Sequence, residues 1–339
     1  MSNKIKFRAI FLLCFSLLFS IVIVWRNYVI VIGQSSKQVL VALNKADASL
    51  AIIDPKDMKI LGKVPTGDSP HEVVLSADGR TAFVANYGAQ TPGSSLSVID
   101  VEAKKELRRV DLSPLLRPHG LVESSGKIYF TSETNRLIGR YDPATNRVDW
   151  LMGTGQNATH MIVVTPDQKR IFTTNIASDT VTAFTFENVP PAKSEITHIA
   201  VGKQPEAIDV APDAKEVWVG LNSEGAIDVI DTAANKTIQK IKLGARPYRI
   251  KFSPDGSRVL ASVPETKEII VIDYATKKEI RRIKLESVPL GIVFSKDGRT
   301  AFVSAVEEDF VLKIDLEKFE TTGKVVTGQA PDGVAAAGI

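Results

Sequence analysis

Three of the four histidines in this 339-residue chain occupy the same kind of position, and their grouping predicts a site that could do chemistry. His71 and His119 each follow a proline, and His160 occupies the matching place one segment later, after Thr159. Glu206 follows the proline of the next segment. Three imidazoles and a carboxylate suit a borderline divalent metal such as zinc, copper or iron. The alternative is a polar lining with no metal and no cofactor.

These positions correspond because the chain repeats. An anchor residue, in most segments the proline of a Gly-x-x-Pro turn, recurs at intervals of 41 to 48 residues. The anchors are Pro70, Pro118, Thr159, Pro205, Pro247, Pro289 and Pro331. The residues that follow them are, in order, His71, His119, His160, Glu206, Tyr248, Leu290 and Asp332. A period of about forty residues filled with strands is typical of a β-propeller.

The segment at residues 247–285 shows how one repeat becomes a blade. Tyr248–Phe252 alternates with a period of two, and Asp255-Gly256 supplies a hairpin turn to the second strand, Arg258–Val263. Glu268–Asp273 and Glu279–Leu285 are the third and fourth strands. Four short antiparallel strands per repeat make a propeller blade.

The two ends of the repeat region complete one blade between them. Only one strand follows Pro331, whereas three precede Pro70, at Val39–Asn44, Ser49–Asp54 and Lys59–Val64. We therefore expect the C-terminal strand to join the N-terminal three and leave no exposed sheet edge. The predicted fold is all-β, a monomeric seven-bladed propeller over residues 37–339.

Residues 1–36 have the pattern of a membrane anchor. Lys4, Lys6 and Arg8 precede an apolar stretch over residues 9–24 that contains the only cysteine, Cys14. This pattern predicts an inner-membrane anchor with the propeller outside the cytoplasm, periplasmic or extracellular. A cleaved signal peptide is the alternative. Removing the four basic charges before residue 37 from the formal +3 leaves −1 for residues 37–339, which gives no electrostatic case for binding nucleic acid.

From residue 38 onward the repeats resemble the YVTN family of β-propellers. The resemblance rests on segments such as Pro70-His71-Glu72-Val73, Ser76-Ala77-Asp78-Gly79 and Val84-Ala85-Asn86, although the segments at 118 and 159 depart from the pattern. It implies a seven-bladed propeller, similar to lactonase-like and cytochrome d1-like ones, and often extracytoplasmic. It does not fix an activity, because propellers serve as lactonases, lyases, haem domains and binding modules.

The first strand of each blade lines the central channel, so the residues after the anchors should meet at one mouth. We expect Arg117, Tyr248, Arg249 and Asp332 to contact a ligand there. The favoured hypothesis is a membrane-tethered module that binds a small molecule, a peptide or a glycan at this mouth. The alternative is a metal-dependent, lactonase-like or lyase-like enzyme that uses the histidines and Glu206.

Overall fold

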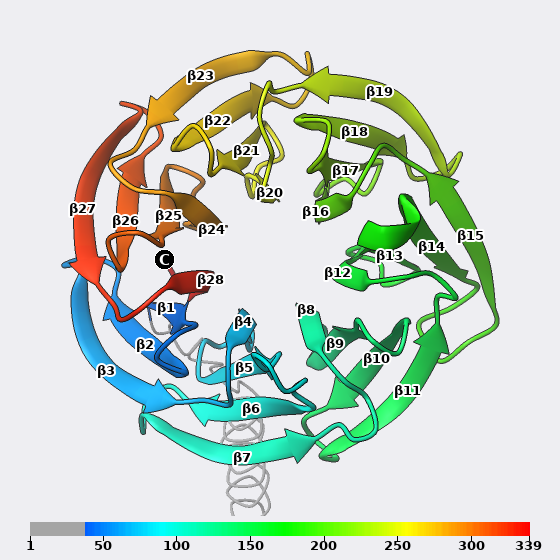
Figure 1. The fold of residues 1–339 in the computed structure, drawn as a ribbon, viewed down its shortest axis with the longest axis horizontal. Coiled ribbons are helices and arrows are strands. Elements are labelled where there is room, and N and C mark those ends of the chain that lie inside the picture. Colours follow the sequence, from blue (N-terminus) through cyan, green and yellow to red (C-terminus); the bar gives the residue numbers. More distant parts are fainter. Residues whose placement is uncertain (1–37) are drawn as a thin grey trace, which may run out of the picture. The chain divides into compact units, whose positions relative to one another are not determined.

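The computed structural model describes residues 38–339, which form seven four-stranded antiparallel sheets arranged in a ring (Figure 1). The predicted N-terminal anchor lies outside the described residues. Within residues 38–339 the only helical element is a short 3₁₀ turn, η1 (Ile176–Ser178). No helix in that part of the chain is long and apolar enough to cross a membrane.

Each blade contributes one strand to each of four concentric positions. The innermost strands are β4 (Pro70–Leu75), β8 (Pro118–Ser124), β12 (Thr159–Val164), β16 (Pro205–Val210), β20 (Arg249–Phe252), β24 (Pro289–Phe294) and β28 (Pro331–Ala337). The second strands are β5 (Thr81–Asn86), β9 (Lys127–Ser132), β13 (Arg170–Asn175), β17 (Glu216–Leu221), β21 (Arg258–Val263), β25 (Thr300–Ala305) and β1 (Val39–Asn44). The third strands are β6 (Ser95–Asp100), β10 (Leu137–Asp142), β14 (Thr180–Phe186), β18 (Ala226–Asp231), β22 (Glu268–Asp273), β26 (Phe310–Asp315) and β2 (Ser49–Asp54). The outer strands are β7 (Lys105–Asp111), β11 (Arg147–Gly153), β15 (Ser194–Ala200), β19 (Lys236–Lys242), β23 (Glu279–Lys284), β27 (Glu320–Val326) and β3 (Lys59–Pro65).

The ring closes as the sequence predicts. The C-terminal strand β28 pairs antiparallel with β1, with Val39 opposite Ala337 and Val41 opposite Ala335. The sheet therefore has the order β28-β1-β2-β3, which combines one C-terminal and three N-terminal strands. The prediction of a seven-bladed all-β propeller closed in this way is confirmed.

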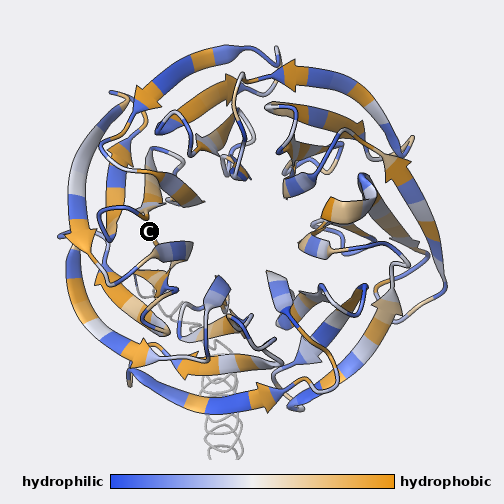
Figure 2. Ribbon diagram, viewed as in Figure 1, coloured by the Kyte–Doolittle hydropathy of each residue, from blue (hydrophilic) through white to orange (hydrophobic). Residues whose placement is uncertain are grey.

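The hydrophobic core lies between neighbouring blades. The second and third strands are almost fully buried and supply most of the apolar side chains. Trp218 of one blade, for example, has its ring centroid 5.4 Å from that of Phe252 in the next blade. The outer strands alternate polar and apolar residues along their length (Figure 2), because only one of their faces packs against the ring.

Candidate functional site

A recurrent irregularity in the inner strands aims side chains into the mouth. In six of them the ladder with the second strand shifts register just after the anchor, for example between Pro70 and Val73. Two residues, such as His71 and Glu72, are thereby left outside the regular pairing. A bulge of this kind redirects side chains. The first residue lies at the mouth, and the second lies one level deeper in the channel.

Hydroxyl groups of the second strands fix the backbone at this point. The Thr131 hydroxyl accepts a hydrogen bond from the backbone N–H of Gly120 at 2.9 Å and donates to the carbonyl of His160, in the next blade, at 2.7 Å. Equivalent hydroxyls bond the carbonyls of further mouth residues. They are Thr174 to Glu206, Ser262 to Leu290 and Ser304 to Asp332. These bridges were not predicted, although a hydroxyl at the fifth position of four second strands was a visible signal.

The three histidines come together as a stack. The ring centroids of His119 and His160 are 3.7 Å apart, and those of His71 and His119 are 5.0 Å apart. The Tyr87 ring contacts both members of this second pair. Its centroid is 4.5 Å from that of His71 and 5.3 Å from that of His119. His119 and His160 are buried. The structure therefore gathers the histidines that the repeat pattern singles out.

Burial keeps two of these imidazoles neutral. It lowers the pKa of His71 from its usual 6.5 to about 4, although the Asp332 carboxylate opposes the change. It also holds the pKa of His119 well below 6.5, and the neighbouring His160 and His71 lower it further. The Nδ1 atoms of His71 and His119 are buried and have no hydrogen-bond partner among the described residues. Orphaned buried nitrogens of this kind call for a partner that the protein itself does not supply.

His160 is oriented by a carboxylate. Its Nδ1 lies 3.0 Å from Glu133 Oε2, and the other carboxylate oxygen accepts a 3.1 Å hydrogen bond from the Tyr87 hydroxyl. Burial alone would raise the pKa of Glu133, but the hydrogen bonds from His160 and Tyr87 outweigh it and lower the pKa. An ionised carboxylate can only accept, so Nδ1 of His160 carries a proton and is the donor in this contact.

Glu206 lies on the Nε2 side of that ring. Its Oε1 is 3.9 Å from His160 Nε2, and its other oxygen accepts a hydrogen bond from Asn222. Neither Glu133 nor Asn222 was predicted as a site residue, because both reach the mouth from loops beyond the second strands rather than from the repeated position.

The other side of the mouth is a polar cluster. The Tyr248 hydroxyl donates to Asp332 Oδ1 at 3.0 Å, and Lys45 Nζ lies 3.3 Å from Asp332 Oδ2. Burial raises the pKa of Tyr248 well above 10, and the Asp332 carboxylate adds to this. Tyr248 and Asp332 thus lie at the mouth as the repeat pattern predicts, with Lys45 as an unpredicted partner.

The two predicted arginines lie in different places. Arg117 donates to the carbonyls of Gly88 and Ala89 at 2.9 and 3.0 Å, and its guanidinium lies 4.6 Å from the centre of the Tyr87 ring. It therefore holds the long loop that follows β5 against the mouth. Arg249 lies one level below, in the channel.

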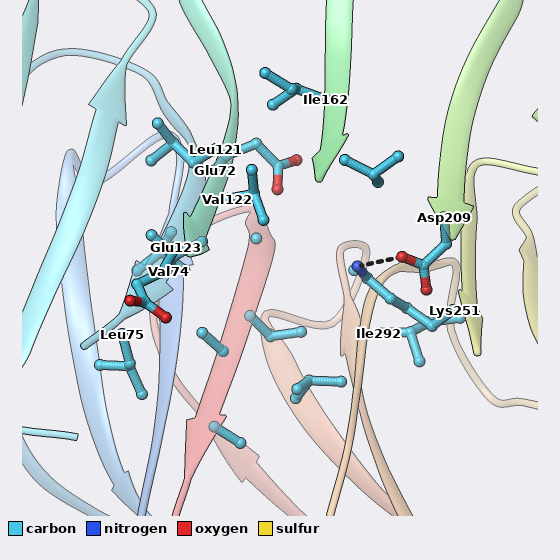
Figure 3. Close-up of a pocket in the computed structure, with 18 of the residues that line it drawn as sticks. Glu72, Val74, Leu75, Leu121, Val122, Glu123, Ile162, Asp209, Lys251 and Ile292 are labelled. Carbon is cyan, nitrogen blue, oxygen red and sulfur yellow. Dashed lines mark ion pairs between the residues drawn. The ribbon is translucent and has the colours of Figure 1, made fainter. Parts of the chain in front are cut away.

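Arg249 forms a floor beneath the histidines. It makes an ion pair with Glu72, from an inner strand on the other side of the ring, and its Nη1 lies 3.4 Å from the sulfur of Met161. Burial raises the pKa of the Glu72 carboxyl, and the Arg249 guanidinium offsets this only in part. Below this floor is a cavity of about 410 Å³ (Figure 3). The Arg249–Glu72 ion pair thus lies between the histidines and this cavity.

The side chains as arranged do not form a metal site. Within residues 38–339 no group of three or more His, Cys, Asp or Glu side chains is placed to hold a metal ion. Within the stack the ring planes of His119 and His160 are inclined by 30°, and those of His71 and His119 by 46°. The metal site at His71, His119, His160 and Glu206 stays a prediction.

Comparison with known proteins identifies the type of propeller. A family model described as the cytochrome D1 heme domain matches residues 155–298. No curated protein matches the chain by sequence. The protein is a seven-bladed β-propeller, and residues 155–298 are similar to the cytochrome D1 heme domain family.

Solved structures support this type through the fold. A functionally unknown protein from Desulfotomaculum acetoxidans has a TM-score of 0.76 at 13% identity, with 89% of this chain and 99% of that chain covered. A putative 6-phosphogluconolactonase from Bacteroides uniformis has a TM-score of 0.74 at 14% identity, covering 88% of this chain and 99% of the other. The dihydro-heme d1 dehydrogenase NirN, solved in complex with DHE, has a TM-score of 0.63 at 15% identity, covering 88% and 75%.

The arrangement of residues described here does not match what a haem requires. A haem pocket combines an imidazole or another axial ligand with a hydrophobic, water-excluding shell. In this propeller the imidazoles lie in a polar ring with Glu133, Glu206 and Asp332, whereas the cavity beneath the floor is lined by no histidine. We therefore derive no step that involves a haem.

Proposed function

We propose that this protein is a binding module whose ligand occupies the histidine mouth. The observation that carries the proposal is the pair of neutral imidazoles, His71 and His119, whose buried Nδ1 atoms lack partners in the described part of the chain. Leaving a buried polar atom unpaired costs about 1–3 kcal/mol, so a ligand that bonds to these rings recovers that free energy.

The shape of the mouth favours a small polar molecule over a peptide or a glycan. The Arg249–Glu72 floor lies one residue below the histidines, and Arg117 holds a loop across one side. The rim presents Tyr87, Tyr248 and Asp332, which offer aromatic surface and hydrogen bonds over a short distance. A compact ligand can use all of these groups at once.

The proposal includes a location outside the cytoplasm with an N-terminal tether. It rests on the basic residues Lys4, Lys6 and Arg8 ahead of the apolar stretch at 9–24. A fusion of alkaline phosphatase to the C-terminus tests it, since that enzyme becomes active only after export. Activity that persists in the membrane fraction agrees with a tether, and an inactive fusion contradicts export.

A thermal-shift screen of the full-length protein tests the binding role. Monosaccharides, sugar lactones, amino acids and tripeptides serve as the probes. We expect at least one class to raise the melting temperature of the wild type and to lose this effect in His119→Gln. The matched control is His198→Gln, which changes an exposed histidine on outer strand β15. A shift that persists in His119→Gln, or no shift from any probe class, contradicts the proposal.

A second candidate is an enzyme of the lactonase or lyase class, and the Glu133–His160 pair favours it. A histidine held by a carboxylate through Nδ1, with a free lone pair on Nε2, is the arrangement of a general base. An assay of sugar-lactone hydrolysis, in which the released acid is measured, tests this role. The candidate requires the rate to fall by about 10²-fold or more in His160→Gln. A rate that does not change in that variant contradicts it.

A further inference from the structure

The cavity below the Arg249–Glu72 floor has features of a site in its own right. Its wall includes aliphatic residues from each of six inner strands. They include Val74, Val122, Val163, Val210, Val293 and Ala335. The seventh inner strand, β20, contributes two cations instead, Arg249 and Lys251, the second of which is labelled in Figure 3. The cavity volume of about 410 Å³ is within the range of small-molecule pockets, about 300–1,000 Å³.

The two cations lie on the same face of one strand. Residues two apart on a strand point to the same side, separated by about 7 Å along it. Arg249 is held in the floor, where one of its terminal nitrogens faces only the weak acceptor sulfur of Met161. Lys251 Nζ lies 3.6 Å from Asp209 Oδ1 and forms no hydrogen bond with any described residue. Both cations therefore have donor capacity left over.

The carboxylates around the cavity are better satisfied. Asp209 accepts a 2.9 Å hydrogen bond from the backbone N–H of Phe252, and Glu123 accepts one of 2.7 Å from that of Gly126. Glu72 accepts from Arg249. The hydrogen-bonding capacity that is left over at the polar end of the cavity thus belongs to the donors, Arg249 and Lys251. An anionic oxygen is the group that can accept hydrogen bonds from them.

We propose that this lower cavity is a second binding site, separate from the histidine mouth, for a small carboxylate with an apolar body. The carboxylate lies against Lys251 and Arg249, and the hydrocarbon part lies against the aliphatic wall from the other six strands. The floor separates this site from the mouth, so the two ligands do not compete.

Isothermal titration calorimetry of the full-length protein with sodium hexanoate tests the proposal, with hexylammonium and 1-hexanol as matched probes. We expect hexanoate to bind one to one and the other two to bind at least about tenfold more weakly, because each lacks the anion that the lysine contacts. In Lys251→Met the affinity for hexanoate falls by about tenfold or more, whereas Lys251→Arg retains it. Lys236→Met, on the exposed outer strand β19, is the control and leaves it unchanged.

A second readout locates the ligand. In methyl NMR spectra, hexanoate should shift the signals of Val163 and Val293 in the cavity wall. The imidazole ¹⁵N–¹H signals of the mouth should stay in place. No binding of hexanoate, equal binding of hexylammonium, or unchanged affinity in Lys251→Met overturns the proposal. Shifts confined to the histidines also overturn it, but they leave the proposed role of the mouth intact.

Discussion

The ion pair between Arg249 and Glu72 gives the sharpest prediction about stability. Both side chains are buried, with 6% and 13% of their surface exposed, and they come from inner strands on different sides of the ring. In Arg249→Met the Glu72 carboxylate loses its only direct cationic partner, because Lys251 is paired with Asp209. Removing one partner of a buried pair costs about 3–5 kcal/mol of unfolding free energy.

The double variant Glu72→Leu/Arg249→Met should recover most of that loss. Replacing a buried pair by apolar residues of similar size is often neutral or stabilising, and the surrounding wall is aliphatic. We expect the double variant to be within about 1 kcal/mol of wild type. The double variant should then lose less free energy of unfolding than the two single variants lose together. The difference is the coupling free energy of the pair, which would be zero for independent sites. Urea denaturation of wild type, both single variants and the double variant measures it.

The loss in Arg249→Met should also depend on pH in a defined direction. Burial already raises the pKa of Glu72 above 4.5 in the wild type, and loss of the guanidinium raises it further. A carboxyl with a raised folded-state pKa contributes stability fully below its unfolded pKa, and that contribution is lost as the pH rises through the folded pKa. The deficit should therefore be small near pH 4.5 and grow toward pH 8. A cost of less than 1 kcal/mol at pH 8, or one that grows on acidification, refutes this reasoning.

Three further predictions concern the ring and the mouth. Deletion of Pro331–Ile339 removes β28 and opens the ring. Most of the domain's free energy of unfolding, roughly 5–15 kcal/mol, should then be lost. An unchanged calorimetric melting temperature would contradict ring closure. Thr131→Val leaves the Gly120 N–H and the His160 carbonyl without the bridging hydroxyl and should cost about 1–3 kcal/mol in urea, whereas Thr197→Val, on an exposed face of β15, should cost nothing measurable. In Glu133→Ala, long-range ¹⁵N–¹H NMR spectra should show that His160 leaves the Nδ1–H tautomer. The control Glu265→Ala, in an exposed loop, should not change the tautomer. If the tautomer is the same in wild type and both variants, Glu133 does not orient the ring.

The fold could be predicted from the sequence because its determinants are local and repeated. The turn residues and the period-two alternation fix four strands per repeat, as in Arg258–Val263 and Glu268–Asp273, both observed with the predicted bounds. Ring closure followed from a count of strands at the two ends of the chain. The aspartate that ends most third strands accepts backbone hydrogen bonds in the following turn, as Asp273 does from the N–H of Thr276 at 2.7 Å.

The site could be predicted only in part. The repeated position after each anchor locates His71, His119 and His160, since equivalent residues of a closed ring face one axis. The contacts that give these rings their chemistry are not encoded in the period. Glu133 reaches His160 from a loop, and Arg249 meets Glu72 across 177 residues of chain. Such pairs depend on the curvature of the ring and on side-chain rotamers, which no local pattern specifies.

The central claim is that ring closure buries a stack of neutral imidazoles at one mouth. An NMR titration of the imidazole signals of the full-length protein tests it most directly. We expect a pKa of about 4 for His71 and a pKa well below 6.5 for His119. If both rings titrate near the ordinary value of about 6.5, they are open to water, and the account of the mouth is wrong.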